Sequence, residues 1–571
     1  MQVSSAAVRS LFLAHNTVIL DVRDPKFLET ACSFMKIGPC EHLEKLVAFA
    51  KNRLGARQAV VEKAYVDADH LYDYCAFYGK GFSSPSSRCG RIHFFSCRTL
   101  PPQDLLVLDK HRKQYLGYVV VRPTGQTAVG RTCLRKPRMR RNKEYLLCKH
   151  TFPAHVNGAS LKVEAFPFIT QDANTFICAG AAIWMQAYYM HEHFGFPRCH
   201  PAQITEIARR YNVHGNVRGG MFVEDMGTAL REMGYNPHVY NYSLRDAETE
   251  VERAVLVRRT VLTAHAIVES RLPCILAISG ADPENPKRRI GHALTAIGHS
   301  FETPGRDRPE QFFSEDPDCR DVFSGALFNG DWVTWFVVHD DQGMPYGRLW
   351  IWDKGRAKKG EYCLFQGADH VALIVPMPRE VSLELPHVAL FARRAKGWWN
   401  DWLGKEVLPK QTSIRSNSGR YTVRYNETLR TNWLKARRTW HVDTTQREDI
   451  EVIRFYLDPS EEFKRRIKKS GMHDDFKRIY QAMTLPKYVW IAEIASLEKI
   501  NSPVEKNRTI RGEVLIDSTA NPFADPWPIL SFHYRGRFAF FPSGWDRPLL
   551  FCRRESEYPP PTRGAASFYG G

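Results

Sequence analysis

The feature that most constrains this chain is a cysteine, Cys178, at the expected start of a helix. Asn174 and Thr175 precede it, and both residue types cap helix N-termini because their side-chain oxygens accept from unpaired N–H groups. No proline or glycine interrupts the residues between Ala181 and Gly195, so the pattern predicts a helix of about four turns. A thiol in the first turn lies at the positive end of the helix dipole, which favours the nucleophilic thiolate. A buried structural cysteine is the alternative, and partners elsewhere in the chain must decide between the two.

Two histidines stand at the front of apolar, strand-like runs. His292 precedes the run 293–297, which follows a second buried-strand pattern at 273–278. His370 precedes the run 371–375. We favour His292 as the base of a nucleophilic site, because a cysteine–histidine–acid order then follows the chain, and His370 stays the alternative.

Two carboxylates end a third strand-like run. The run 332–338 is rich in aromatic and β-branched residues and leads to His339, Asp340 and Asp341. Neighbouring side chains on a strand face opposite sides, so His339 and Asp340 should not both reach one site. A base beside a thiol needs a third group to hold its tautomer and orientation, and either aspartate can supply it.

Cys178, His292 and Asp340, each on its expected element, resemble the catalytic residues of the papain-like cysteine peptidase superfamily. The closest likeness is to the peptidase domains that cut double-glycine leaders from bacteriocins, and to their free-standing relatives. In that branch a glutamine precedes a Cys-Gly-small-small helix, the histidine heads a Gly-His-hydrophobic strand, and the acid is aspartate. The resemblance is carried by motifs and covers roughly residues 161–378.

The resemblance implies a papain-like central domain, in which the helix bearing Cys178 packs on an antiparallel sheet. It implies that Cys178 attacks a carbonyl carbon, that His292 exchanges the proton and that Asp340 orients the imidazole. Papain has Asn followed by Ser-Trp-Gly at the corresponding strand end, which matches Asp340 better than Asp341. The backbone N–H of Cys178 is the expected oxyanion donor. Gln171 is a second candidate donor, although it lies seven residues before Cys178, one more than in papain.

The composition fits a well-packed globular protein, with 43% hydrophobic and 12% aromatic residues in a chain of 571. No apolar run is long enough to span a membrane, and the first residues lack the basic segment and apolar core of a signal peptide. The 13 cysteines are dispersed without metal-ligand spacing. We therefore expect no metal, no cofactor and a reducing, cytoplasmic location.

The net charge is +18, and two large basic clusters contribute to it besides the short run Lys287, Arg288 and Arg289. The first, called the basic patch here, contains Arg135, Lys136, Arg138, Arg140, Arg141 and Lys143. The second, on a predicted helix, contains Lys464, Arg465, Arg466, Lys468 and Lys469. Charge runs are usually solvated faces, and no nucleic-acid-binding motif accompanies these two. Nucleic acid therefore stays a disfavoured partner, bound through the basic patch if at all.

A third polar group lies near the N-terminus, at Asp67, Asp69, His70 and Asp73. Aspartate favours turns and helix starts, so we expect a solvated turn leading into a helix rather than a metal site.

The sequence predicts an α+β protein with three domains and a tail. Residues 1–145 form a mixed α/β domain with a recognition or docking role, and 146–378 form the papain-like domain. Residues 379–557 form an α+β accessory domain, and the Pro- and Gly-rich residues 558–571 form a disordered tail.

The favoured function is that of an intracellular cysteine peptidase. Its partners would be a protein or peptide substrate, cut at a peptide or isopeptide bond, and a protein activator. One alternative is another thiol acyl-transfer enzyme, an amidase or a transglutaminase-like one. Another is a catalytically degenerate basic scaffold that binds nucleic acid or a protein.

Overall fold

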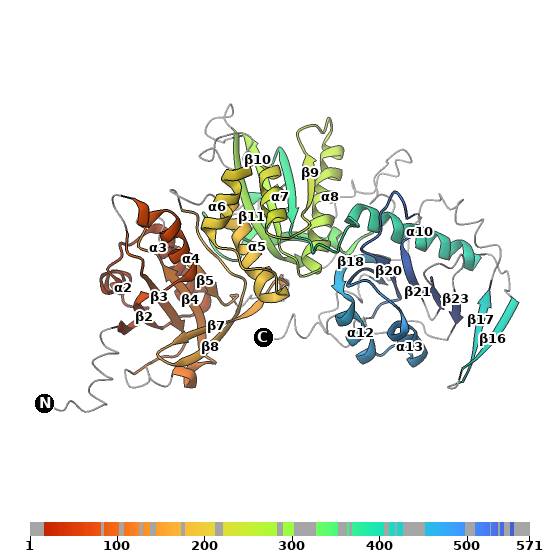
Figure 1. Cartoon of the computed structure of the whole chain (residues 1–571), viewed down its shortest axis with the longest axis horizontal. Helices are drawn as coiled ribbons and strands as arrows, with labels where there is room; N and C mark the ends of the chain where they lie inside the picture. Colours follow the sequence, from red (N-terminus) through yellow and green to blue (C-terminus); the bar gives the residue numbers. More distant parts are fainter. Residues whose placement is uncertain are drawn as a thin grey trace. The chain divides into compact units, whose positions relative to one another are not determined.

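In a computed structural model, the chain folds into two compact units (Figure 1). Unit 1 comprises Met1–Arg245, Arg271–Ser300 and Trp335–Pro376, and unit 2 comprises Asp246–Ser270, Phe301–Thr334 and Met377–Gly571. The structure describes residues 16–552 apart from 82–84, 102–107, 125–128, 138–143, 173–177, 212–220, 282–288, 302–326, 352–361, 365–367, 405–409, 417–418, 426–450, 497–498, 500–508, 526, 535–536 and 542–548. Helices are combined with largely antiparallel sheets, so the α+β class is confirmed. The three-domain division stays a prediction, and the expected tail lies outside the described residues.

The N-terminal part of unit 1 is a five-stranded antiparallel sheet in the order β1-β2-β3-β4-β5. Its strands are β1 (Thr17–Asp21), β2 (Gln58–Tyr65), β3 (Cys89–Phe95), β4 (Tyr115–Val121) and β5 (Val129–Leu134). Three helices accompany them, α2 (Phe27–Met35), α3 (Glu41–Phe49) and α4 (Ala68–Ala76). Every residue of β3 and β4 is buried, so both faces of this sheet are covered.

The polar group at the start of α4 is buried, which corrects one expectation. The Asp67 side chain accepts from the backbone N–H groups of Asp69 and His70, each at 3.1 Å, so the predicted helix start is confirmed. Asp67 is 1% exposed and Asp69 2%, so the predicted solvation is wrong. Ion pairs from Arg131 to Asp67 and from Arg198 to Asp69 compensate for the burial.

The second sheet of unit 1 holds the strands that the sequence singled out. Its order is β14-β13-β12-β11-β10-β15-β9, with β6 paired to β11; β13 and β14 pair in parallel, whereas β10 pairs antiparallel with β11 and β15. The strands are β6 (Glu144–Leu146), β9 (His238–Ser243), β10 (Cys274–Ala281), β11 (Arg289–Phe301), β12 (Val333–His339), β13 (Gly347–Trp350), β14 (Tyr362–Cys363) and β15 (His370–Val375).

Three helices lie together beside this sheet (Figure 1): α5 (Cys178–Phe194), α6 (Pro201–Tyr211) and α7 (Val223–Glu232). Residues Ala179 to Met190 of α5 are all buried, since its neighbours surround it. Within this core the Gln186 amide donates to the carbonyls of Pro273 and Ile374, at 3.0 and 3.2 Å, and so ties α5 to the sheet. A hairpin of β7 (His150–Val156) and β8 (Ala159–Ala165) also packs against α5.

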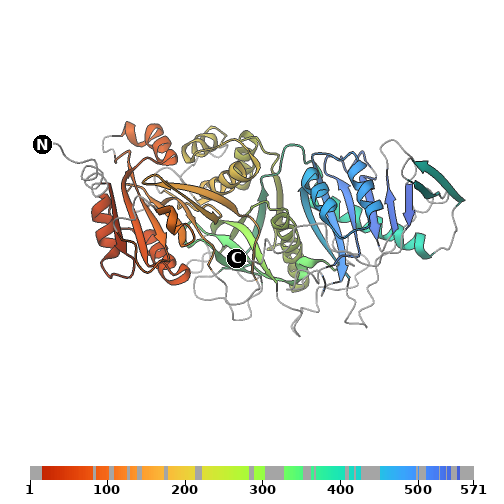
Figure 2. The same cartoon turned by 90° about the horizontal axis from the view of Figure 1, so that it is seen from below.

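Unit 2 is built on an eight-stranded sheet in the order β16-β17-β23-β22-β21-β20-β19-β18. Its strands are β16 (Lys410–Ser416), β17 (Gly419–Tyr425), β18 (Glu451–Pro459), β19 (Tyr488–Ser496), β20 (Gly512–Asp517), β21 (Ile529–Tyr534), β22 (Arg537–Phe540) and β23 (Leu549–Cys552). The helices α10 (Leu385–Gly404), α12 (Ser460–Lys469) and α13 (Asp474–Ala482) pack on it, and Figure 2 shows α12 and α13 side by side. No helix in the described part of the chain has the length and apolarity needed to cross a bilayer.

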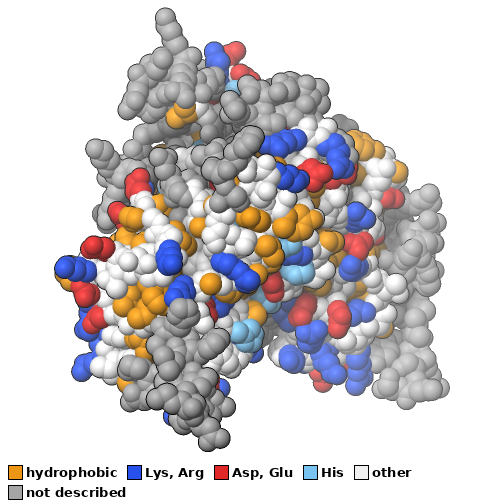
Figure 3. Space-filling view, turned by 60° about the vertical axis from the view of Figure 1, so that its left-hand side comes forward, with side chains coloured by type: hydrophobic (Ala, Val, Ile, Leu, Met, Phe, Trp, Pro, Cys, Tyr) orange, Lys and Arg blue, Asp and Glu red, His pale blue; other side chains and the backbone are white. Residues whose placement is uncertain are grey.

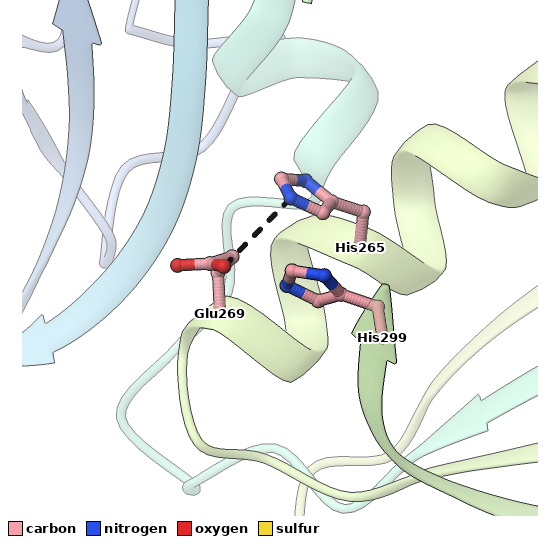
Figure 4. Close-up of side chains that lie close together, drawn as sticks. All are labelled: His265, Glu269 and His299. Atoms are coloured by element: carbon pink, nitrogen blue, oxygen red, sulfur yellow. Dashed lines mark ion pairs between the residues drawn. The ribbon is translucent and has the colours of Figure 1, made fainter. Parts of the chain in front are cut away.

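The long helix α8 (Glu250–Glu269) also belongs to unit 2. Thr249 and Glu252 form a reciprocal capping box at its start, which satisfies two backbone N–H groups. One turn separates His265 from Glu269, and their side chains form an ion pair of 3.8 Å (Figure 4).

Candidate functional site

Cys178 is the first residue of α5 and is half-buried. Its backbone N–H is among those at a helix start that lack an intrahelical acceptor, as an oxyanion donor requires. The expected capping residues, Asn174 and Thr175, lie outside the described part of the chain.

His292 and Asp340 form a hydrogen-bonded pair in the same unit. His292 lies on β11 opposite Ile278 of β10, and Asp340 directly follows β12. His292 Nε2 lies 2.7 Å from Asp340 Oδ1, and the two side chains are 12% and 13% exposed. The backbone N–H of Gln342 also donates to Asp340, at 3.1 Å. A Cβ at Gly343 would lie 2.5 Å from the Asp340 carboxylate, so the glycine lets the turn close around it.

The electrostatics of the pair favour an imidazolium and a carboxylate. Burial disfavours the charged form of His292, but the hydrogen bond with Asp340 and the nearby Cys178 thiol outweigh it and raise the pKa of His292 to about 10. Burial likewise disfavours the ionised Asp340, yet the hydrogen bond from His292 prevails and lowers the pKa of Asp340. Because Nε2 of His292 is hydrogen-bonded to Asp340, Nδ1 is the ring nitrogen that can exchange a proton with the Cys178 thiol.

Asp341, the alternative orienting acid, is buried beside the pair and is 0% exposed. Neither of its carboxylate oxygens makes a well-formed hydrogen bond to a described residue. Burial raises the pKa of Asp341 to about 7, although the His292 charge and the nearby backbone N–H of Gln171 oppose the rise. The His292 hydrogen bond therefore goes to Asp340, while Asp341 lies next to both.

His370, the alternative base, is exposed at the first position of β15. It pairs with Ser279, whereas His292 pairs with Ile278, the next residue along the same strand. Consecutive strand positions point to opposite faces, so the register places His370 on the face opposite His292. Gln171 is half-buried, and its side chain as oxyanion donor stays a prediction.

Side-chain atoms of the types that bind metal ions lie close together at the same site. The donor atoms of His292, Asp340 and Asp341 lie within 4.8 Å of one another. Imidazole and carboxylate suit a divalent cation, but the hydrogen bond between His292 and Asp340 already occupies two of these groups.

The basic clusters are only partly described. Arg135 and Lys136 of the basic patch are half-buried, and the rest of the patch lies outside the described residues: Arg138, Arg140, Arg141 and Lys143. On α12, Arg465 pairs with Glu461 and Glu462, and Arg466 pairs with Asp458. On the face shown in Figure 3, basic side chains are mixed with acidic and apolar ones. These positions therefore lend little support to a polynucleotide groove.

Sequence reasoning overlooked three polar residues near the cysteine loop: the buried Arg122 and Asp172, and the half-buried Tyr78. The Tyr78 hydroxyl donates to the Asp172 carboxylate, and Arg122 Nη1 lies 3.9 Å from the same group. The one local signal is Arg122 at the end of the apolar strand β4, where a charge needs a partner.

No known protein family, curated protein or solved structure matches this chain. The papain-like assignment consequently stays a proposal.

Proposed function

We propose that the protein is a cysteine-type hydrolase with a papain-like Cys178–His292–Asp340 triad, most simply a peptidase. One observation supports this above all: a single imidazole is hydrogen-bonded to an aspartate at 2.7 Å, and the thiol at a helix start lies close enough to that imidazole to raise its pKa. The three residues come from separate segments of the chain, and each stands on the type of element that the resemblance implies.

The chemistry follows from these positions. The imidazolium of His292 balances a thiolate on Cys178, which attacks the carbonyl carbon of a peptide or isopeptide bond. The oxyanion that forms accepts from the backbone N–H of Cys178. His292 then protonates the leaving amine, and the resulting thioester is hydrolysed by water that His292 deprotonates. Asp340 holds the ring throughout and stabilises its positive charge.

The first test is cleavage of a peptide library derived from a proteome, read by mass spectrometry of new termini. Wild type is compared with Cys178→Ala and with Cys75→Ala, which changes an exposed cysteine elsewhere in unit 1. We expect new termini with wild type and Cys75→Ala only. Cleavage that persists with Cys178→Ala would refute the proposal. Release of ammonia from glutamine peptides without cleavage would indicate another thiol acyl-transfer reaction instead.

A further inference from the structure

The chain before the cysteine loop is fixed by a polar cluster with the N-terminal part of unit 1, in which Arg122 and Asp172 are buried and Tyr78 is half-buried. Arg122 and Asp172 are 2% and 1% exposed, so their charges are almost fully removed from water. Arg122 Nη1 lies 3.9 Å from Asp172 Oδ2, and the Tyr78 hydroxyl donates to the same oxygen. Burial makes each partner necessary to the others, since a lone charge here would be strongly unfavourable.

The residues just before Asp172 are docked on β5. Phe168 forms an antiparallel bridge with Thr132, with N–O distances of 2.8 and 2.9 Å. The Thr170 hydroxyl donates to the Val129 carbonyl at 2.9 Å, and Arg122 donates to the Thr170 carbonyl at 3.3 Å. The segment therefore has a fixed path up to Asp172.

This path leads directly to the candidate triad. Gln171 lies between Thr170 and Asp172, and its backbone N–H lies close enough to Asp341 to stabilise that carboxylate. Asp341 in turn lies within 4.8 Å of His292 and Asp340, measured between their donor atoms. The fixed segment thus brings the backbone of Gln171 near the carboxylate that lies beside the imidazole.

We propose that Asp172 is a positioning residue for the triad, held by Arg122 and Tyr78. The inference rests on the proposed function and adds to it a role for the N-terminal part of unit 1. If Asp172 loses its charge, the segment at Gln171 shifts, and the environment of His292 that activates the thiol changes with it. The N-terminal strands and α4 are then part of the catalytic unit and not a detachable accessory.

The experiment compares Asp172→Asn with Tyr78→Phe and with Asp67→Asn in the full chain. Asp67→Asn is the matched control, because Asp67 is equally buried and pairs with Arg131 at 2.9 Å, but it bonds to Arg131 and the first turn of α4 and not to the segment at Gln171. The readouts are the rate of Cys178 alkylation by iodoacetamide across about pH 5 to pH 10 and the melting temperature.

For Asp172→Asn we expect alkylation at neutral pH to slow about 10- to 100-fold, because displacing a supporting group by about 1 Å costs this much. The pH profile should also move toward that of an ordinary thiol, near pH 8.5. Tyr78→Phe should change the profile in the same direction but less. Asp67→Asn should lower the melting temperature and leave the profile unchanged.

A wild-type pH profile of Cys178 alkylation in Asp172→Asn would overturn the proposal. A change of that profile in Asp67→Asn as large as the one in Asp172→Asn would overturn it too. If Asp172→Asn does not fold, Tyr78→Phe decides, because it keeps the buried charge pair. If wild-type Cys178 is itself an ordinary thiol that His292→Ala does not affect, the proposed function fails together with this inference. An activated wild-type thiol that Asp172→Asn leaves unchanged overturns the inference alone.

Discussion

Replacing Asp340 by asparagine should lower the pKa of His292 by about one to three pH units, the usual effect of a nearby opposite charge. The carboxylate lies 2.7 Å from Nε2, and both side chains are largely buried, so solvent screens the pair little. The rise in the pKa of His292 from 6.5 to about 10 corresponds to about 5 kcal/mol. Asp340 is the largest contributor to this rise, Cys178 and the charge of Asp341 add to it, and asparagine keeps the size of the side chain without its charge.

The same pair makes stability depend on pH in a defined direction. Because the pKa of His292 is higher in the folded protein, its contribution is complete below about pH 6.5 and is lost as the pH rises through about 10. The lowered pKa of Asp340 acts on the acid side, where the contribution is lost as the pH falls through that value. Asp340→Asn should flatten the loss of stability on the alkaline side.

The assay is NMR titration of the protein with ¹³C-labelled histidine, with His292 assigned from its missing signal in His292→Gln. Glu62→Gln is the matched control, because Glu62 pairs with another buried histidine, His93, at 3.0 Å. There, burial and the charge of Arg91 prevail and lower the pKa of His93 to about 4. Asp340→Asn should change the pKa of His292 and leave the pKa of His93 unchanged. A wild-type His292 that titrates near 6.5, or one that Asp340→Asn leaves unmoved, would refute the reasoning.

Three further outcomes follow from particular contacts. His370→Ala should leave the alkylation rate of Cys178 unchanged, because its strand register places it on the face opposite His292; a large loss of rate would make His370 the base. Gly298→Ala should lower the melting temperature by several degrees, since the added Cβ would lie 2.2 Å from the Tyr145 carbonyl oxygen; an unchanged melting temperature would contradict this steric argument. Arg454→Met should destabilise unit 2 by about 3–5 kcal/mol in urea, because Glu493 is 0% exposed and would keep a buried charge without its guanidinium. Adding Glu493→Leu should restore much of that loss, and a double variant as unstable as the single one would argue against the unpaired charge.

Local patterns predicted the elements that carry the candidate site residues. Helix periodicity placed Cys178 at the start of α5, and apolar runs placed His292 and Asp340 on or beside strands. The contact between His292 and Asp340 could be anticipated only from the order of the residues and the family resemblance. Asp340 and Asp341 differ in hydrogen bonding and burial, which depend on the packed sheet and not on the local sequence.

The cluster of Tyr78, Arg122 and Asp172 could not be predicted from local sequence. Tyr78 and Asp172 are 94 residues apart, and nothing near either one specifies the other. The aspartates at the start of α4 were expected in solvent because short polar residues favour turns; Arg131 and Arg198, brought in by tertiary packing, make their burial tolerable. Such partners are fixed by the fold as a whole.

The measurement that tests the central claim most directly is the pH dependence of iodoacetamide labelling at Cys178, read by mass spectrometry in wild type and His292→Ala. An activated thiol predicts rapid labelling of wild type well below about pH 8.5, slowed when the imidazole is removed. Labelling that follows an ordinary thiol in both proteins would contradict the thiolate–imidazolium pair and, with it, the proposed triad.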